Sequence, residues 1–201
     1  LSLSALKEKS WSSENVKINK NVGENTVELL KENTKAVPYL YIKDEAGNET
    51  YMTSDGAIYD TKKPSAPEIK IETKDPVAGV SDPGIEIFNS DVNFSISVED
   101  PVVNGTYSGL AEVSYKIKNN GTVTQEKKFN NENNKIKPEL MQREFSENLT
   151  VDDSKNNGNN IEIEVTARDN AGNESSETRK LAIDITKPKI TVSYDNNNVA
   201  N

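Results

Sequence analysis

The sequence predicts an all-β protein built from antiparallel β-sandwiches in tandem. Three observations predict this fold: short runs in which apolar and polar residues alternate, turn-forming clusters of Gly, Asn and Pro between those runs, and two similar segments about 125 positions apart. Alternation over a few residues is typical of strands that bury one face. Self-similarity at a fixed spacing is typical of repeated domains.

The composition favours several thin hydrophobic cores over one thick core. Of the 201 residues, 33% are hydrophobic and 28% are charged. This apolar fraction is low for a single large domain, but it suits sandwiches whose strands each bury one face. Because alternating apolar runs recur along most of the chain, we expect folded sheets rather than a disordered segment.

Two similar segments reveal a repeat. Residues 39–49 read YLYIKDEAGNE, and residues 163–174 read IEVTARDNAGNE. Each is followed by a second landmark, DTKKP from Asp60 and DITKP from Asp184. Asp44 and Asp169 are 125 positions apart (169 − 44), and Asp60 and Asp184 are 124 apart (184 − 60). Two landmarks at nearly one spacing predict neighbouring units of the same kind in one chain.

The repeat divides the chain into three parts. Residues 1–63 are a partial or divergent first unit, residues 64–187 are a complete unit, and residues 188–201 open a following unit. A proline follows the linker lysine at both boundaries, and proline stiffens a junction because it fixes φ and cannot donate to a strand ladder. Residues 189–194, KITVSY, are expected to be the first strand of that following unit.

The complete unit carries about seven predicted strands. The clearest spans residues 91–99, where Val92, Phe94, Ile96 and Val98 fall on one face. Similar alternation is found over residues 69–71, 113–117, 145–151, 161–167 and 181–185. This number of short strands, separated by turn residues, is typical of an antiparallel sandwich. Residues 138–144 lack alternation and are expected to form a helical turn that starts at Pro138.

Several of these segments resemble a known family. The sequence ARDNAGNE at 167–174, followed by IDITKP at 183–188, resembles bacterial immunoglobulin-like domains that occur in tandem in surface proteins and adhesins. The run SGLAEVSYKI at 108–117 is similar to the third strand of that family. The resemblance covers the complete unit and the end of the first, whereas residues 1–38 match poorly. It implies an immunoglobulin-like β-sandwich in a secreted or cell-surface protein, and the cysteine-free, acidic composition is common in Gram-positive surface proteins.

The composition excludes several functions. The sequence has no histidine and no cysteine, so it contains no Ser-His-Asp triad, no Cys-His pair and no thiolate or imidazole zinc site. A net charge of −9 argues against a nucleic-acid partner, and no stretch approaches the roughly 20 apolar residues that membrane insertion requires. A glycosidase-like pair of carboxylates stays open, but thin sandwiches rarely form the cleft it needs. We therefore expect a chain that is not an enzyme.

Acidic residues predict a candidate site at one end of the complete unit. In an immunoglobulin-like sandwich the loops after the second and sixth strands meet the incoming linker at the same end. That end would collect Asp60, Glu99, Asp100, Asp169 and Asn173. One interpretation is structural: Asp169 caps backbone amides, and Gly with Asn takes the positive φ of the turn. The other is a Ca²⁺ site, because calcium prefers several carboxylate and carbonyl oxygens; no other cofactor is expected.

The leading functional hypothesis is a non-catalytic spacer or stalk module whose partners are the neighbouring immunoglobulin-like domains. One alternative is a binding module for a glycan or a host protein, and another is an accessory domain of a secreted carbohydrate-active enzyme. Exposed aromatic side chains would favour the binding module. Tyr39, Tyr41, Tyr51 and Tyr59 cluster in the first unit, but the alternation of Tyr39 with Tyr41 predicts a buried sheet face instead.

Overall fold

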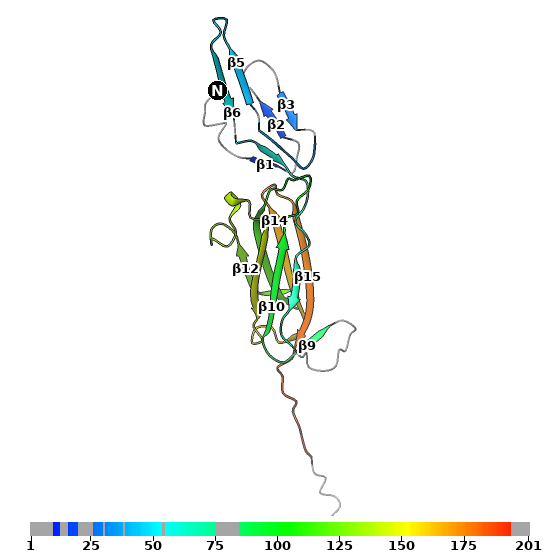
Figure 1. The fold of residues 1–201 in the computed structure, drawn as a ribbon. Coiled ribbons are helices and arrows are strands. Elements are labelled where there is room, and N and C mark those ends of the chain that lie inside the picture. Colours follow the sequence, from blue (N-terminus) through cyan, green and yellow to red (C-terminus); the bar gives the residue numbers. More distant parts are fainter. Residues whose placement is uncertain are drawn as a thin grey trace, which may run out of the picture.

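The described chain is all β and falls into two parts. The computed structural model describes residues 10–12, 16–19, 26–29, 31–37, 39–53, 55–74 and 85–193, and these contain no α-helix. In Figure 1 a leading part, coloured blue to cyan, stands above an elongated sandwich, and the residues after the last strand run away from the opposite end. The linker between the two parts contains Asp60.

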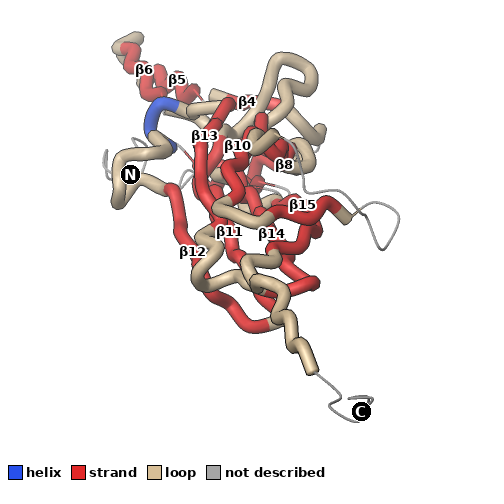
Figure 2. Tube along the Cα trace, turned by 90° about the horizontal axis from the view of Figure 1, so that it is seen from below, coloured by secondary structure: helices blue, strands red, loops and turns tan. Residues whose placement is uncertain are grey.

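The sandwich consists of two sheets. One has the order β13-β10-β8, with β8 (Glu68–Ile71), β10 (Val92–Glu99) and β13 (Glu144–Val151), and all its pairs are antiparallel. The other has the order β12-β11-β14-β15-β9, with β9 (Glu86–Phe88), β11 (Leu110–Asn119), β12 (Thr122–Phe129), β14 (Gly158–Asp169) and β15 (Glu174–Ile183). Its pairs are antiparallel except β9 with β15, which are parallel. Figure 2 shows the sheets as two layers.

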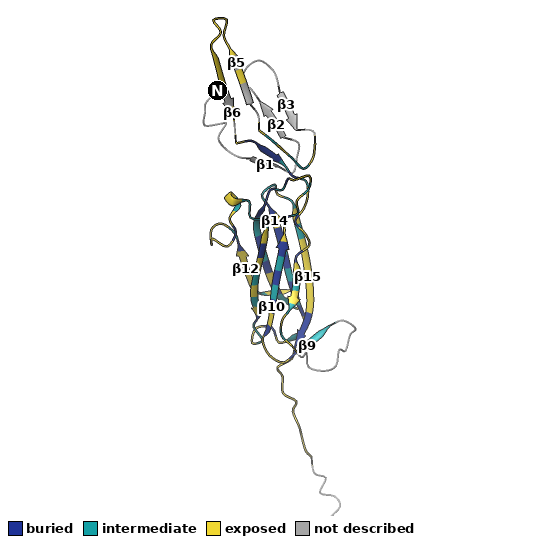
Figure 3. Ribbon diagram, viewed as in Figure 1, coloured by how far each residue is buried: buried dark blue, intermediate teal, exposed yellow. Residues whose placement is uncertain are grey.

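The core lies between these two sheets. Val92, Phe94, Ile96 and Val98 of β10 are all buried, as their alternation predicts. Every second residue of β14 from Ile161 to Ala167 is buried in the same core cluster, and Figure 3 shows buried positions in both layers. Burying one such apolar side chain stabilises the fold by about 1.5–3 kcal/mol, so the alternating pattern fixes which face of each strand points inward.

Some expectations within the sandwich need correction. Strands β9 and β12 lie in segments where the sequence predicts none. Strand β12 has no regular inward alternation because it lies at the edge of its sheet, and β9 has only three residues. The helical turn is confirmed as a 3₁₀ helix, η2 (Pro138–Leu140), which begins at its proline. It ends before residue 144 because Met141 takes a left-handed backbone conformation (φ 51°).

The described residues of the leading part contain seven short strands: β1 (Ser10–Ser12), β2 (Val16–Asn19), β3 (Thr26–Leu29), β4 (Thr34–Ala36), β5 (Tyr39–Lys43), β6 (Glu49–Thr53) and β7 (Ala57–Tyr59). They form a sheet β1-β7-β4 and two separate pairs, β2-β3 and β5-β6. Tyr41 and Tyr51 face each other across the β5-β6 pair and are 42% and 60% exposed. The expectation that Tyr41 lies on a buried face is wrong, because a sheet of two strands has little surface to cover its side chains.

The two similar segments of the sequence form turns with the same hydrogen bonds. In the leading part the backbone N–H and the side-chain amide of Asn48 donate to the two carboxylate oxygens of Asp44, both at 2.8 Å. In the sandwich Asn173 donates to Asp169 through the same atoms and at the same distances. Each Asp N–H also donates to the Asn carbonyl, at 3.0 and 3.1 Å. The similar sequences of the two segments thus form turns of the same local structure.

Residues 184–193 have no regular secondary structure. The sequence predicts a strand over 189–194, of which Tyr194 lies outside the described residues. A strand needs a hydrogen-bonded neighbour, and no strand among the described residues pairs with this segment. Ile190 is 85% exposed, so this segment offers apolar surface. The predicted strand stays a prediction.

Candidate functional site

Three carboxylates meet at the end of the sandwich that faces the leading part. Asp60 comes from the linker after β7, Asp100 directly follows β10, and Asp169 is the last residue of β14. All three residues are buried, with at most 1% of their surface exposed. One oxygen from each lies within 4.8 Å of an oxygen of the other two. We call Asp60, Asp100 and Asp169 the junction triad.

Asp169 is held by its own turn. Its two carboxylate oxygens accept hydrogen bonds from the backbone N–H and the side-chain amide of Asn173, so the capping predicted from the sequence is present. The positive φ of this turn falls on Gly172 (φ 92°) and not on Asn173. The Asn173 amide also donates to the Asp60 carbonyl at 3.0 Å. The turn therefore fixes Asp169 and the incoming linker at once.

Asp60 joins the linker to the sandwich. One carboxylate oxygen accepts from the Lys62 N–H at 2.9 Å within the linker, and the other accepts from the Ser108 N–H at 2.8 Å within the sandwich. The next residue, Thr61, donates its N–H to the Asn33 side chain of the leading part at 3.1 Å. Further along, the Ser65 N–H donates to the Glu99 carbonyl at 2.8 Å. The linker is thus bonded to both parts of the molecule.

Asp100 leaves one buried oxygen without a partner. Its Oδ2 accepts from the Gly109 N–H at 2.6 Å. Among the described residues, none donates to its Oδ1, and none forms a hydrogen bond with the buried Ser108 hydroxyl oxygen. Gly109 has φ +83°, and a Cβ there would lie 2.7 Å from the carbonyl carbon of Met141. Only glycine therefore lets this N–H approach Asp100. Unpartnered buried polar atoms are costly, and a proton, a water or a cation at this point would satisfy these two oxygens.

The triad concentrates negative charge where water is excluded. Among the described residues no lysine or arginine forms an ion pair with Asp60, Asp100 or Asp169. The pKa of Asp100 is raised to about 7, chiefly by burial and also by the nearby carboxylates of Asp60 and Asp169, against backbone hydrogen bonds, above all that of Gly109, which lower it. Burial also raises the pKa of Asp169. The site favours either a proton or a bound cation.

Glu99 does not join the triad. Its side chain lies on the solvent side of β10 and forms an ion pair with Arg143. The alternation of β10 explains this: Val92 to Val98 point inward at every second position, so Glu99 points outward and Asp100 inward. Two contributors were not predicted as site residues, Ser108 and Gly109. A Ser-Gly pair before a strand indicates a point where the backbone packs closely against another group. The sequence does not indicate which group that is.

The donor set fits calcium. Calcium takes six to eight oxygen ligands at about 2.3–2.6 Å in flexible geometry. Two oxygens bound to one such ion are separated by up to about twice that length, and the triad oxygens lie within 4.8 Å of one another. The free Oδ1 of Asp100 and the free hydroxyl of Ser108 offer further oxygen. Zinc prefers histidine and cysteine, and the sequence contains neither.

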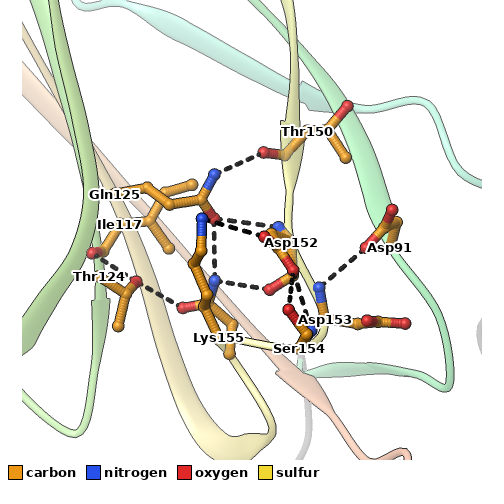
Figure 4. A network of polar contacts seen from close by, with 10 residues as sticks. Asp91, Ile117, Thr124, Gln125, Thr150, Asp152, Asp153, Ser154 and Lys155 are labelled. Atoms are coloured by element: carbon orange, nitrogen blue, oxygen red, sulfur yellow. Dashed lines mark hydrogen bonds and ion pairs between the residues drawn. The ribbon is translucent and has the colours of Figure 1, made fainter.

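A second acidic group lies at the opposite end of the sandwich and differs in its exposure to solvent and in its pairing with a lysine. Asp91, Asp152 and Asp153 are exposed or half-buried. Their oxygens are used internally: Asp91 accepts from the Asp153 N–H at 2.8 Å, and Asp152 accepts from Ser154 and pairs with Lys155 (Figure 4). Because these carboxylates lie in a loop open to solvent and Asp152 already pairs with a lysine, we do not take this group as the candidate site.

No protein-family model matches the chain, and a search of curated proteins finds no match. Within the described residues, no helix has the length and apolar character needed to cross a membrane.

Proposed function

We propose that this chain is a non-catalytic, immunoglobulin-like spacer of a multidomain secreted or cell-surface protein, in which the junction triad sets the angle between neighbouring units. One observation carries the proposal: the carboxylate of Asp60, a linker residue, is buried in the end of the following domain and accepts a hydrogen bond from the Ser108 N–H. A flexible tether between independent domains would leave this side chain in water.

The linker bonds support a stiff junction. Asp60 and Ser65 form hydrogen bonds with the sandwich, and Thr61, which lies between them, forms one with the leading part. In addition, the Ser175 hydroxyl of β15 donates to the Ser65 carbonyl at 2.9 Å. Charge-assisted hydrogen bonds such as that to Asp60 are stronger than neutral ones. Bending at this linker would break several of these bonds together.

We further propose that the functional protein binds Ca²⁺ at the junction triad. Asp60, Asp100 and Asp169 would hold the ion, and their three negative charges would no longer oppose one another. Since Asp60 belongs to the linker while the other two belong to the sandwich, the ion would bind only when the junction is closed. Calcium would thereby stabilise the folded, stiff form by mass action.

The experiment is thermal unfolding of the full chain in excess calcium and in excess chelator, with calcium stoichiometry from isothermal titration calorimetry. We expect one calcium per chain and an unfolding midpoint that falls on chelation. Asp60→Asn and Asp169→Asn should abolish the difference between the two conditions. Asp44→Asn is the matched control: it changes an exposed aspartate that has the same turn hydrogen bonds but belongs to neither group of clustered carboxylates found among the described residues, and it should preserve the calcium response.

Two results would contradict parts of the proposal. An unchanged midpoint and no titration heat would leave the triad as a hydrogen-bonded linker anchor without calcium. A junction that small-angle X-ray scattering shows to be flexible in both conditions would overturn the stiff spacer itself.

One observation favours a binding module as the second candidate. Tyr41 and Tyr51 form an exposed pair with ring centroids 5.1 Å apart. Exposed tyrosines supply the rigid amphipathic surface that binding sites use. A glycan array probed with the full chain and with the Tyr41→Ala, Tyr51→Ala double variant tests this candidate. Binding that the double variant loses, and that Asp60→Asn keeps, would place the main function on this hairpin.

A further inference from the structure

The linker after the sandwich repeats the local geometry of the linker before it. The Lys62 N–H donates to one carboxylate oxygen of Asp60 at 2.9 Å, and the Thr186 N–H donates to one carboxylate oxygen of Asp184 at 2.9 Å. Both aspartates directly follow a strand with a parallel neighbour, β7 beside β1 and β15 beside β9. The two linkers therefore leave their strands in the same way.

The two aspartates differ in what their second oxygen meets. For Asp60 that oxygen accepts the Ser108 N–H of the domain that follows, and the residue is 1% exposed. Asp184 is exposed, and in the described part of the chain no donor reaches its second oxygen. The local backbone bond is the same in both, so the two aspartates differ only in whether described residues from elsewhere in the chain cover the carboxylate.

We infer that Asp184 is the docking group for a second domain of the same kind as residues 64–187. Its carboxylate would enter the end of that domain between the equivalents of Asp100, Ser108 and Asp169, as Asp60 does here. This inference rests on the proposed function, because it extends the junction described above to the next one along the chain.

The receiving turn is repeated as well as the linker. The Asp44–Asn48 turn has the hydrogen bonds of the Asp169–Asn173 turn. In the sandwich the Asn173 amide makes one bond more, to the Asp60 carbonyl. Asn48 is exposed, and its amide donates within its own turn. The described part of the chain thus has one complete junction, in which the Asp60 linker meets the Asp169–Asn173 turn. Each component is also found once more by itself: the linker at Asp184 and the turn at Asp44–Asn48.

The occupant is a following domain in the same chain, not a second free molecule. The receiving end of the sandwich is already filled by Asp60, which is bonded there by Ser108 and Asn173. A second molecule would have to displace a linker that is held by its own chain at high effective concentration. A domain joined directly after Lys187 has an empty receiving end and no such competitor.

The test inserts a second copy of residues 64–187 after Lys187 of the full chain. Because the sequence has no cysteine, spin labels can be placed at single introduced cysteines. Asp55 and the first-copy Glu132, both exposed, span the first joint. The exposed Glu177 of the first copy and the Glu132 equivalent of the second copy span the second joint. Each labelled pair is measured in excess calcium by pulsed electron–electron resonance.

We expect equally narrow distance distributions across the two joints. Asp184→Asn should broaden the second distribution roughly twofold or more, toward the free domain motion expected without a fixed interface, and leave the first unchanged. Asp60→Asn should do the reverse. In the unextended chain Asp184→Asn should leave the unfolding midpoint unchanged, because nothing docks on it there.

The outcomes separate this inference from the proposed function. A narrow first joint with a broad second joint would overturn the role of Asp184 while the spacer proposal stands. Two broad joints would overturn both. A narrow second joint that Asp184→Asn does not broaden would show that other contacts hold the domains, and would also overturn the role of Asp184.

Discussion

The turns at Asp44–Asn48 and at Asp169–Asn173 have the same hydrogen bonds, yet the pKa values of their aspartates are shifted in opposite directions. The pKa of Asp44 is lowered, chiefly by the side-chain and backbone hydrogen bonds from Asn48. The pKa of Asp169 is raised, because burial outweighs the equivalent bonds from Asn173. Asp44 is exposed, whereas Asp169 is covered by the linker and lies beside Asp60 and Asp100. The local motif thus sets the geometry, and the surroundings set the chemistry.

The largest expected effect is on pH dependence in excess chelator. Asp100 has a pKa of about 7 in the folded protein and 3.8 as the ordinary value. Between about pH 4 and 7 the folded state therefore holds a proton that the unfolded state lacks, so the free energy of unfolding falls as pH rises through this window. At about 1.4 kcal/mol per pKa unit, the loss is at most about 4 kcal/mol.

The measurement is urea unfolding at a series of pH values, repeated with Asp100→Asn, which should flatten the curve in this window. Asp44→Asn is the control and should leave it unchanged, since the lowered pKa of Asp44 acts in the opposite sense: its contribution is lost as pH falls below about 4. Stability that rises from pH 4 to 7 would contradict the raised pKa of the triad.

The next effect concerns the close approach of Gly109 to Asp100. Gly109→Ala would force a side chain into the left-handed region and within 2.7 Å of Met141 backbone, and we expect a loss of about 3 kcal/mol or more in the free energy of unfolding. Gly172→Ala and Gly47→Ala also have positive φ but open space around the added Cβ. These two controls should cost only about 1 kcal/mol each. Equal losses at all three positions would show that Gly109 is not a point of close packing.

Asparagine substitutions compare the two turns directly. Asn173→Ala removes the part-buried amide bonds to Asp169 and to the Asp60 carbonyl, and should cost about 1–3 kcal/mol. Asn48→Ala removes the equivalent bond in an exposed turn, and should cost about 0.5 kcal/mol or less. Chemical denaturation of both variants measures the difference. Similar costs would contradict the view that the junction gives the second turn its importance.

The smallest expected effect is that of the outward-facing Glu99. Its ion pair with Arg143 lies at the surface, and surface pairs contribute about 0–1 kcal/mol. Glu99→Gln should therefore change the unfolding midpoint little and leave the calcium response of the full chain intact, in contrast to Asp100→Asn. A lost calcium response would return Glu99 to the set of ligands.

Some of the fold was decided by local sequence. The alternation at Val92, Phe94, Ile96 and Val98 predicts the inward face of β10 because successive strand side chains point to opposite faces. The glycine in each AGN turn predicts the positive φ observed at Gly47 and Gly172. The same parity rule, carried two residues past Val98, accounts for the inward Asp100 and the outward Glu99, although both residues were expected in the site from the sequence. Strand β12 was not predicted because it lies at the edge of its sheet, where only part of the strand covers the core. Its sequence therefore does not alternate regularly between apolar and polar residues.

The sequence by itself determined the strands with one buried face, the spacing of the repeat, and the exclusion of histidine and cysteine chemistry, since each depends on residue type and order along the chain. Only the tertiary structure decided that Asp60, Asp100 and Asp169, which the sequence expects at one end, are fully buried there. It also decided that an oxygen of Asp100 and one of Ser108 have no partner among the described residues, and that matching turns hold aspartates of opposite pKa shift. The physical reason is that burial and charge repulsion depend on what surrounds a side chain in space, and those neighbours come from distant parts of the chain.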